Sequence, residues 1–243
     1  MSPASDPRTA VGVVLAAGIG ARVGADGNKA YLRLAGRSML SWSVRAVAGT
    51  AEIGRVILVY RRGERDVAAR ALGDDLPGVA VELVEGGDSR HESEFNMLRH
   101  IAADIEDGTV EVVLIHDAAR PLAGPDLMRA ALDTARRHGG AVPAVAATGL
   151  ARPRPGGGLE PLTERLVRVQ TPQAFRAGPL LQAYRRAADE GFDGTDTSAC
   201  VQHFTEVDVR VFPGAATNLK VTYPPDIRLA EHLLAGTVNA DRR

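Results

Sequence analysis

The stretch VGVVLAAGIG at residues 11–20 decides the fold of this 243-residue chain. A run of aliphatic residues that ends in a glycine turn is typical of a central strand buried on both faces of a sheet. We therefore expect the first strand over 11–17, with Gly18 and Gly20 in the tight turn that follows it.

Strand and helix patterns then alternate along the chain. Aliphatic runs predict strands over 55–60, 79–84 and 110–115. Helical spacing of apolar residues predicts helices over 38–49, 64–73, 89–105 and 125–138. Strands that alternate with helices in this way lie parallel and are joined by right-handed crossovers. The predicted fold class is α/β, a three-layer α/β/α arrangement with a mostly parallel sheet.

The pattern changes between residues 143 and 171. This segment has a centre rich in Pro and Gly, flanked by short extended stretches without a helical period. It predicts a protruding β-arm, and because such a hairpin buries too little apolar area to be stable alone, we expect it to pack against the main domain or a second subunit.

The remaining patterns complete a single domain over 11–243, after a disordered leader at 1–10. They predict helices over 178–190 and 195–204, strands over 207–212 and 219–221, and a last helix that opens at Pro224 and Pro225.

Composition excludes several classes of protein. Lys and Arg total 29 against 30 for Asp and Glu, so a net charge of −1 gives no steering towards nucleic acid or a membrane surface. The single cysteine, Cys200, cannot form an internal disulfide, and no Cys/His spacing suggests zinc. The opening MSPASDPRTA lacks the apolar core of a signal peptide, and no stretch approaches the roughly 20 apolar residues of a membrane span. These features predict a cytoplasmic protein.

Two cations follow the first glycine turn, Arg22 and, seven residues on, Lys29. Glycines let backbone N–H groups approach an anion, and two cations can neutralise a polyphosphate. The segment favours a triphosphate site over the alternative of a surface turn with two solvated cations. It is neither GxGxxG, because Val23 stands at the third glycine position, nor a Walker loop, because GK[ST] is missing.

A carboxylate is expected in the same crevice. In LIHDAARPL (114–122), Asp117 follows the fourth strand, and ligands of open α/β sheets bind beyond the carboxyl ends of the strands. A carboxylate beside a triphosphate suits Mg²⁺, which takes one or two protein carboxylates. Arg120 is expected to contact phosphate or to form a structural salt bridge, and His116 to be a satisfied packing residue.

The third strand end carries a second glycine pair. In EGGDSRHES (85–93), Gly86 and Gly87 leave room for a flat ligand, and polar edges come from Asp88, Arg90 and Ser93. This pattern suits a nucleobase or a ribose. Towards the C-terminus, Lys220 lies on the short predicted strand, and Thr195 is expected to cap a helix before it serves as a ligand.

With these segments in order, the chain resembles the 2-C-methyl-D-erythritol 4-phosphate cytidylyltransferase family and, more loosely, the ribitol-5-phosphate cytidylyltransferases. The likeness runs over about 11–235. It rests on AAGIGARVGADGNK (16–29), VEGGDSR (84–90), LIHDAARPL (114–122), VQTPQAF (169–175), TDTSA (195–199) and NLKVTYPPDIRLAE (218–231).

The resemblance implies a Rossmann-like nucleotidyltransferase fold and the transfer of CMP from CTP to a phosphorylated polyol, with release of pyrophosphate. It implies a homodimer in which the arm of one subunit reaches the site of the other. The implied catalytic residues are Arg22, Lys29, Lys220 and Arg165. The implied nucleotide-binding residues are Ala16, Ala17, Gly18, Gly20, Gly87, Asp88, Ser93 and Ala118. The implied acceptor-binding residues are Thr148, Arg165, Thr195 and Asp196, and the implied Mg²⁺ ligand is Asp117.

The chain departs from the family pattern in four places, one of which is an approach to TPQ (171–173) that is about two residues shorter and bears on the alignment of Arg165. The family often has PKQ where this chain has Asn28-Lys29-Ala30, which keeps the cation. The arm reads ATGL at 147–150, where the family usually has an Asp-Thr pair and a basic residue. Glu92 and Glu94-Phe95 replace smaller or neutral residues.

Alternative functions stay open at this point. The acceptor could be another polyol phosphate, such as ribitol 5-phosphate, or a phosphonate. From a different class, the chain could be a nucleotide-binding regulatory protein without turnover. A dinucleotide-dependent oxidoreductase is disfavoured, because Tyr60 at the end of the second strand is followed by Arg61 and Arg62 instead of an acidic residue.

Overall fold

The computed structural model describes residues 9–18, 28–162 and 164–240, without the side chains of 236–240. Most of the expected leader, residues 1–8, lies outside the described residues. Thr9 and Ala10 are already placed, because the first strand begins at Ala10 and the Thr9 hydroxyl donates a hydrogen bond to Glu111.

One half of the central sheet is parallel. Its strands are β1 (Ala10–Leu15), β4 (Ile53–Tyr60), β5 (Glu82–Glu85) and β6 (Val112–Asp117). They lie in the order β6-β1-β4-β5, with Leu15 of β1 opposite Val59 of β4 and Asp117 of β6. The strands that the aliphatic runs predicted therefore end together at one edge of the sheet.

The other half is mixed. Its strands are β7 (Gly139–Ala146), β10 (Val167–Val169), β11 (Gln173–Arg176) and β12 (Asp208–Pro213). β11 runs antiparallel to both β6 and β7, whereas β12 runs parallel to β7. The resulting eight-stranded sheet confirms the predicted α/β class with a mostly parallel core.

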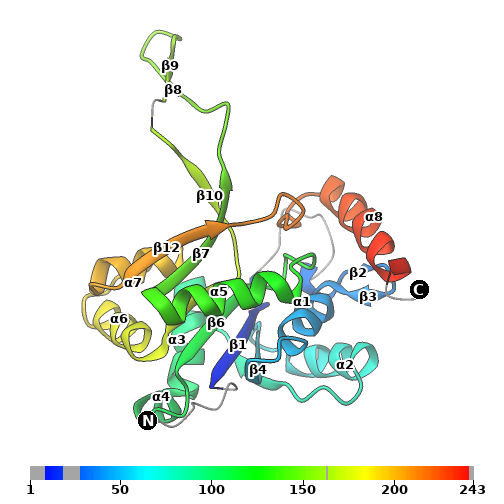
Figure 1. Ribbon diagram of the computed structural model, residues 1–243. Coiled ribbons are helices and arrows are strands. Elements are labelled where there is room, and N and C mark those ends of the chain that lie inside the picture. The colour runs from blue at the N-terminus through cyan, green and yellow to red at the C-terminus, as the bar shows by residue number, and fades with distance from the viewer. Residues whose placement is uncertain (1–8, 19–27, 163, 241–243) are drawn as a thin grey trace.

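Helices cover both faces of this sheet (Figure 1). One face packs against α1 (Met39–Ala48), α2 (Arg65–Asp75) and α5 (Pro125–His138). The other packs against α3 (Arg90–His100), α4 (Ala102–Glu106), α6 (Ala177–Asp189) and α7 (Thr197–Phe204). Strand β1 serves both layers, since Val14 belongs to the first cluster and Val11 and Val13 to the second.

A third, smaller apolar cluster joins the last helix of the chain to residues 32–42 and to the loop after β6. It packs α8 (Pro224–Ala240) against the hairpin of β2 (Arg33–Leu34) and β3 (Arg37–Ser38), which follows the short helix η2 (Lys29–Tyr31). Within the described ranges, none of the helices combines the length and the apolar character needed to cross a membrane.

The arm projects from the body of the molecule (Figure 1). β7 and β10 lead out of the sheet, and β8 (Ala151–Pro153) pairs with β9 (Leu159–Pro161) towards the tip. The stem of the arm is the pairing of residues 144–146, at the end of β7, with β10, and these residues lie within the predicted 143–171. Leu150 is 50% exposed and Leu159 is 72% exposed, so the arm presents apolar surface to solvent in a single chain.

Some predicted elements were wrong in place or kind. Residues 219–221 form no strand, because the Val221 N–H donates to the carbonyl of Ala119 in a loop and not to a neighbouring strand. The helix expected over 89–105 is two helices, with a break at the buried Ile101, whose φ of −106° and ψ of 12° lie off the helical values. β7 follows α5 without a loop and was missed, as were β11 and the β2–β3 hairpin.

Candidate functional site

A cavity of about 390 Å³ lies at the edge where β1, β5 and β6 end. Every predicted nucleotide-binding residue that the structure describes lines this cavity: Ala16, Ala17, Gly18, Gly87, Asp88, Ser93 and Ala118. Lys29, Asp117 and Lys220 line it as well. Backbone hydrogen bonds tie these strand ends together, from Ala118 N–H to the Leu15 carbonyl (3.0 Å) and from Gly86 N–H to the Tyr60 carbonyl (2.8 Å).

Other predicted site residues lie elsewhere. Gly20 and Arg22 fall in 19–27, outside the described residues. Thr148 and Arg165 are exposed on the arm, and neither is among the residues that line the cavity of this chain. Thr195 is exposed and does not cap α7. The cap is Asp196, whose carboxylate accepts a hydrogen bond from Ser198 N–H (3.0 Å) and another from Gln173 Nε2 (2.8 Å).

Both lysines of the 243-residue chain line this cavity. The Lys29 ammonium donates to the Val221 carbonyl (2.9 Å), and the Lys220 ammonium donates to Asp117 Oδ2 (2.7 Å). The segment that carries Lys29 therefore lies directly against the segment that carries Lys220, although 190 residues separate them in the sequence. All other side chains that carry a permanent positive charge are arginines.

Asn28 holds Lys29 in place from the start of η2. Its Oδ1 accepts from Ala30 N–H (3.0 Å), which caps the short helix, while its Nδ2 donates to the Ala16 carbonyl at the end of β1 (2.8 Å) and to Glu64 Oε2 (2.8 Å). Asn28 stands at the position where the resembled family often has proline. Its side chain thus fastens the chain just before Lys29 to the end of β1, the strand that opens the site.

Asp117 is the electrostatic centre of the cavity. It is 5% exposed, and its Oδ1 accepts from Arg90 Nη1 (2.5 Å) while its Oδ2 accepts from Lys220 and lies 3.9 Å from Arg120 Nε. Burial alone would raise the pKa of this carboxyl, but the charges and hydrogen bonds of Arg90 and Lys220 hold the pKa far below its usual value. Asp117 is therefore an anion throughout the neutral range.

The loop at the end of β5 approaches β1 closely because it contains Gly86. A Cβ at that position would lie 2.6 Å from the Ala17 Cβ, so no other residue fits without a shift. Side chains of α3 fix the loop from behind: Ser93 Oγ accepts from Gly87 N–H (3.0 Å), and Glu92 accepts from Asp88 N–H (2.7 Å). The loop thereby forms a wall of the cavity against which a flat base or sugar can lie.

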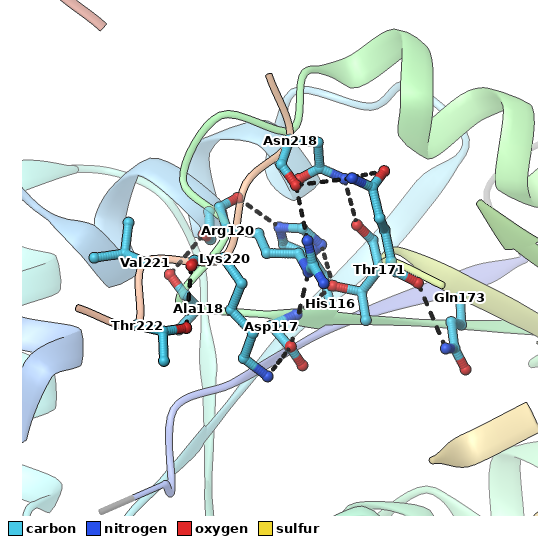
Figure 2. A network of polar contacts seen from close by, with 12 residues as sticks. His116, Asp117, Ala118, Arg120, Thr171, Gln173, Asn218, Lys220, Val221 and Thr222 are labelled. Atoms are coloured by element: carbon cyan, nitrogen blue, oxygen red, sulfur yellow. Dashed lines mark hydrogen bonds and ion pairs between the residues drawn. The ribbon is translucent and has the colours of Figure 1, made fainter. Parts of the chain in front are cut away.

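A chain of hydrogen bonds behind Asp117 fixes the protonation of His116 (Figure 2). His116 Nε2 lies 3.0 Å from the Arg120 carbonyl, which can only accept, so Nε2 carries the proton. Nδ1 then accepts from the Thr171 hydroxyl (3.1 Å), whose oxygen in turn accepts from Asp117 N–H (2.9 Å). Burial lowers the pKa of His116 to about 4, so the ring is neutral, as expected for a packing residue.

The same network places Lys220 through Asn218, a residue that sequence reasoning did not single out. The Asn218 carboxamide donates to the Thr171 carbonyl (2.8 Å), and the Asn218 carbonyl accepts from Arg120 Nη1 (2.8 Å) and from Gln170 Nε2 (3.1 Å) (Figure 2). Of the two roles expected for Arg120, the structural one is present here. The sequence signal for Asn218 was its place in the motif NLKVTYPPDIRLAE. In the structure this motif is hydrogen-bonded to the motif VQTPQAF through Gln170 and Thr171.

Among the described residues that line the cavity, Asp117 and Asp88 carry carboxylates, and Asp117 is the buried one. No group of three or more His, Cys, Asp or Glu side chains that could hold a metal occurs in the described part of the chain. A single ionised carboxylate fits Mg²⁺ where phosphates and water supply the other ligands. The Lys220 ammonium is paired with Asp117 Oδ2, the oxygen that a metal would also use. Because the Lys220 side chain is half-exposed, the ammonium has room to move from that oxygen to a phosphate.

Sequence reasoning undervalued two charged residues of α3. Arg90, mentioned only as a polar edge of the base site, contacts Asp117 directly. Glu94, noted only as a departure from the family pattern, is 1% exposed and lies 2.9 Å from Arg90 Nε. The one available signal was their spacing of four residues, which places both on the same face of a helix.

Comparison with known proteins gives a consistent result. Residues 10–236 match the family described as IspD, 2-C-methyl-D-erythritol 4-phosphate cytidylyltransferase. The chain is 39% identical over 232 residues to the enzyme of that name from Cereibacter sphaeroides, covering 93% of this chain and 97% of the relative. It is 34% identical over 238 residues to the enzyme of that name from Solibacter usitatus, and the match covers 92% of this chain and 95% of that relative.

Solved structures agree with the sequence match. The 4-diphosphocytidyl-2C-methyl-D-erythritol synthase of Anaerococcus prevotii superposes with a TM-score of 0.80 at 26% identity, covering 95% of this chain and 97% of its own. The 2-C-methyl-D-erythritol 4-phosphate cytidylyltransferase of Thermus thermophilus superposes with a TM-score of 0.69 at 30% identity. This match covers 92% of this chain and 98% of the other.

The buried, neutral His116 makes the protein sensitive to acid. In the unfolded chain the ring takes up a proton near the ordinary histidine pKa of 6.5, whereas in the fold it does so only near about 4. Because the unfolded state binds more protons between these values, the free energy of unfolding is expected to fall as pH drops from about 6.5 to about 4, by about 3 kcal/mol from this residue.

The measurement is chemical denaturation across this pH range, with His116→Gln beside the wild type. The glutamine can keep the bond to the Arg120 carbonyl but does not titrate. We expect the variant to be the less stable protein above about pH 6.5 and the gap to narrow on acidification. A gap that stays constant with pH would contradict the neutral, buried ring.

Proposed function

The chain belongs to the 2-C-methyl-D-erythritol 4-phosphate cytidylyltransferase family, and from that premise we propose that its cavity binds CTP and transfers CMP to the phosphate of 2-C-methyl-D-erythritol 4-phosphate. As a member of this family it is a nucleotidyltransferase, and its reaction releases pyrophosphate and supplies isoprenoid precursor biosynthesis. The observation that carries the assignment of the site is the meeting of Lys29, Lys220 and Asp117 in one cavity. A volume of about 390 Å³ lies in the range of small-ligand pockets.

Each wall of the cavity offers the chemistry that one part of CTP requires. The loop with Gly87, Asp88 and Ser93 faces the cytosine and ribose, and the turn after β1, with Gly18, faces the phosphates. Backbone N–H groups at such a turn bind anions. Gly20 and Arg22 are proposed to belong to the same phosphate site.

The reaction depends on charge stabilisation. A phosphate oxygen of the acceptor attacks the α-phosphorus of CTP, the bond from that phosphorus to the bridging oxygen breaks, and pyrophosphate leaves with the electron pair. Negative charge grows on the α-phosphate and the leaving group, where the ammonium groups of Lys29 and Lys220 can offset it. No general base is needed, because the acceptor phosphate is already ionised at neutral pH.

Asp117 is the residue that would hold Mg²⁺. When bound, the metal neutralises phosphate charge and aligns the nucleotide for in-line attack. The buried, permanently ionised carboxylate supports this role, and the Lys220 ammonium that now pairs with it would be released towards the α-phosphate.

The acceptor side of the site is proposed to be completed by a second subunit. Thr148 and Arg165 lie on the arm, and the apolar surface of the arm, including Leu159 at 72% exposure, is expected to be covered in a homodimer. Asp196 at the start of α7 would contact the acceptor with Thr195. The altered arm sequence makes ribitol 5-phosphate the competing acceptor, and pyrophosphate release from CTP with each acceptor separates the two.

Replacing Lys29 with Ala, or Lys220 with Ala, is expected to lower kcat by about 100-fold or more, because each change removes a charge that stabilises the transition state. The measurement is pyrophosphate release in the presence of CTP, Mg²⁺ and 2-C-methyl-D-erythritol 4-phosphate. Arg185→Ala, which removes a half-exposed surface cation, serves as the control and keeps wild-type turnover. Normal kcat in either lysine variant would refute the assignment of the site.

Mixing two inactive variants tests the exchange of arms. Lys29→Ala disables a pocket, and Arg165→Ala disables an arm. In a mixed dimer, the intact arm of the Lys29→Ala subunit can serve the intact pocket of the Arg165→Ala subunit. Random mixing should therefore restore about a quarter of wild-type activity. An arm that served its own pocket would give no recovery after subunit exchange.

A further inference from the structure

Glu94 is a buried carboxylate that lies close to the site without lining it. The residue belongs to the second turn of α3, is 1% exposed, and is not among the residues that line the cavity. A charged side chain is seldom buried without a partner, since removing it from water is costly. Its position therefore requires compensating contacts.

Two hydroxyl donors and one guanidinium, from three helices, meet at this carboxylate. The Tyr184 hydroxyl of α6 donates to Oε2, the Thr197 hydroxyl of α7 donates to Oε1 (2.8 Å), and Arg90 Nε of α3 lies 2.9 Å from Oε1. Tyr184 and Thr197 are themselves fully buried. The carboxylate is thus held by two buried hydroxyls that do not line the cavity and by Arg90, which does.

Arg90 connects Glu94 to the cavity. Its guanidinium places Nε towards Glu94 and Nη1 towards Asp117 Oδ1 (2.5 Å), so one rigid planar group spans two carboxylates. Nε and Nη2 are both buried without a hydrogen-bond partner among the described residues, so the ion pair with Glu94 and the hydrogen bond to Asp117 are the contacts that hold the group. Without Glu94, the guanidinium would keep only Asp117 as an ion-pair partner among the residues that the structure describes.

We propose that Glu94 is a positioning residue that holds the Arg90 guanidinium and, through it, the orientation of the Asp117 carboxylate at the reacting end of the cavity. This role rests on the proposed function of the cavity. Outer partners of this kind, which orient a charged group of a site, commonly affect activity by about 10- to 100-fold.

The test is a double-mutant cycle on kcat with Glu94→Gln and Arg90→Met. Glu94→Gln alone is expected to lower kcat by about 10-fold or more with a small change in the KM for CTP, because the loop at 86–88 is untouched. In the Arg90→Met background the same substitution should cause no further fall in kcat, since its effect passes through Arg90. Thr197→Val, which removes one donor and keeps the shape, should lower kcat in the same direction.

The control is Glu106→Gln, which breaks another Glu–Arg pair, with Arg185, at the surface (2.6 Å) and should leave kcat unchanged. Wild-type kcat in both Glu94→Gln and Thr197→Val, with only the melting temperature lowered, would show a merely structural role and overturn the proposal. Equal losses in kcat with and without Arg90 would overturn it as well.

A second readout is independent of turnover. The Arg90 Nε–H signal in a ¹⁵N–¹H NMR spectrum, assigned by its loss in Arg90→Met, should be protected from exchange in the wild type and exposed in Glu94→Gln. An unprotected signal in the wild type would overturn the positioning role even if the chain used another acceptor. Absence of pyrophosphate release from the wild type would instead refute the proposed function.

Discussion

The site depends on one buried carboxylate, Asp117, surrounded by cations. Arg90 contacts one of its oxygens, and Lys220 and the more distant Arg120 lie at the other. In a cavity of low polarity, these positive groups would repel one another without the anion between them. Asp117 therefore allows positive charge to gather at the end of the parallel strands, where a polyphosphate needs it. The anion belongs to β6 and the cations to loops and α3, so the sheet fixes the geometry of the whole cluster.

Lysine usage supports the same view. A chain with 29 basic residues uses lysine at two positions, and both are in the cavity. An ammonium group is a compact charge on a flexible stem with three rotatable donors, whereas a guanidinium is planar and rigid. The rigid group serves where orientation must be fixed, as in Arg90 between Asp117 and Glu94. In the proposed function, the compact group would serve where a cation must follow phosphates whose charge changes during the reaction.

Part of the fold and of the site could be predicted from sequence because local patterns carried it. β1, β4 and β6 are continuous aliphatic runs, and Gly18, Lys29, Asp117 and Lys220 line the cavity at the edge where these strands end. The four-residue β11 and β7, which opens on two glycines and contains Pro143, have no comparable aliphatic run. Glu94 could not be assigned, because a charged residue on a helix ordinarily faces water, and its burial depends on Tyr184 and Thr197 from distant helices. The roles of Thr148 and Arg165 stay predictions, since they involve a second chain.

The most direct test of the shared nucleotide site is amine acetylation, followed by mass spectrometry of the two lysines. Apart from the terminal amino group, Lys29 and Lys220 carry the only primary amines of the 243-residue sequence, so the label reports on the cavity alone. If both ammonium groups surround the phosphates of one CTP, the nucleotide with Mg²⁺ should protect both lysines from the reagent. Modification of either lysine at the same rate with and without saturating CTP would contradict the account.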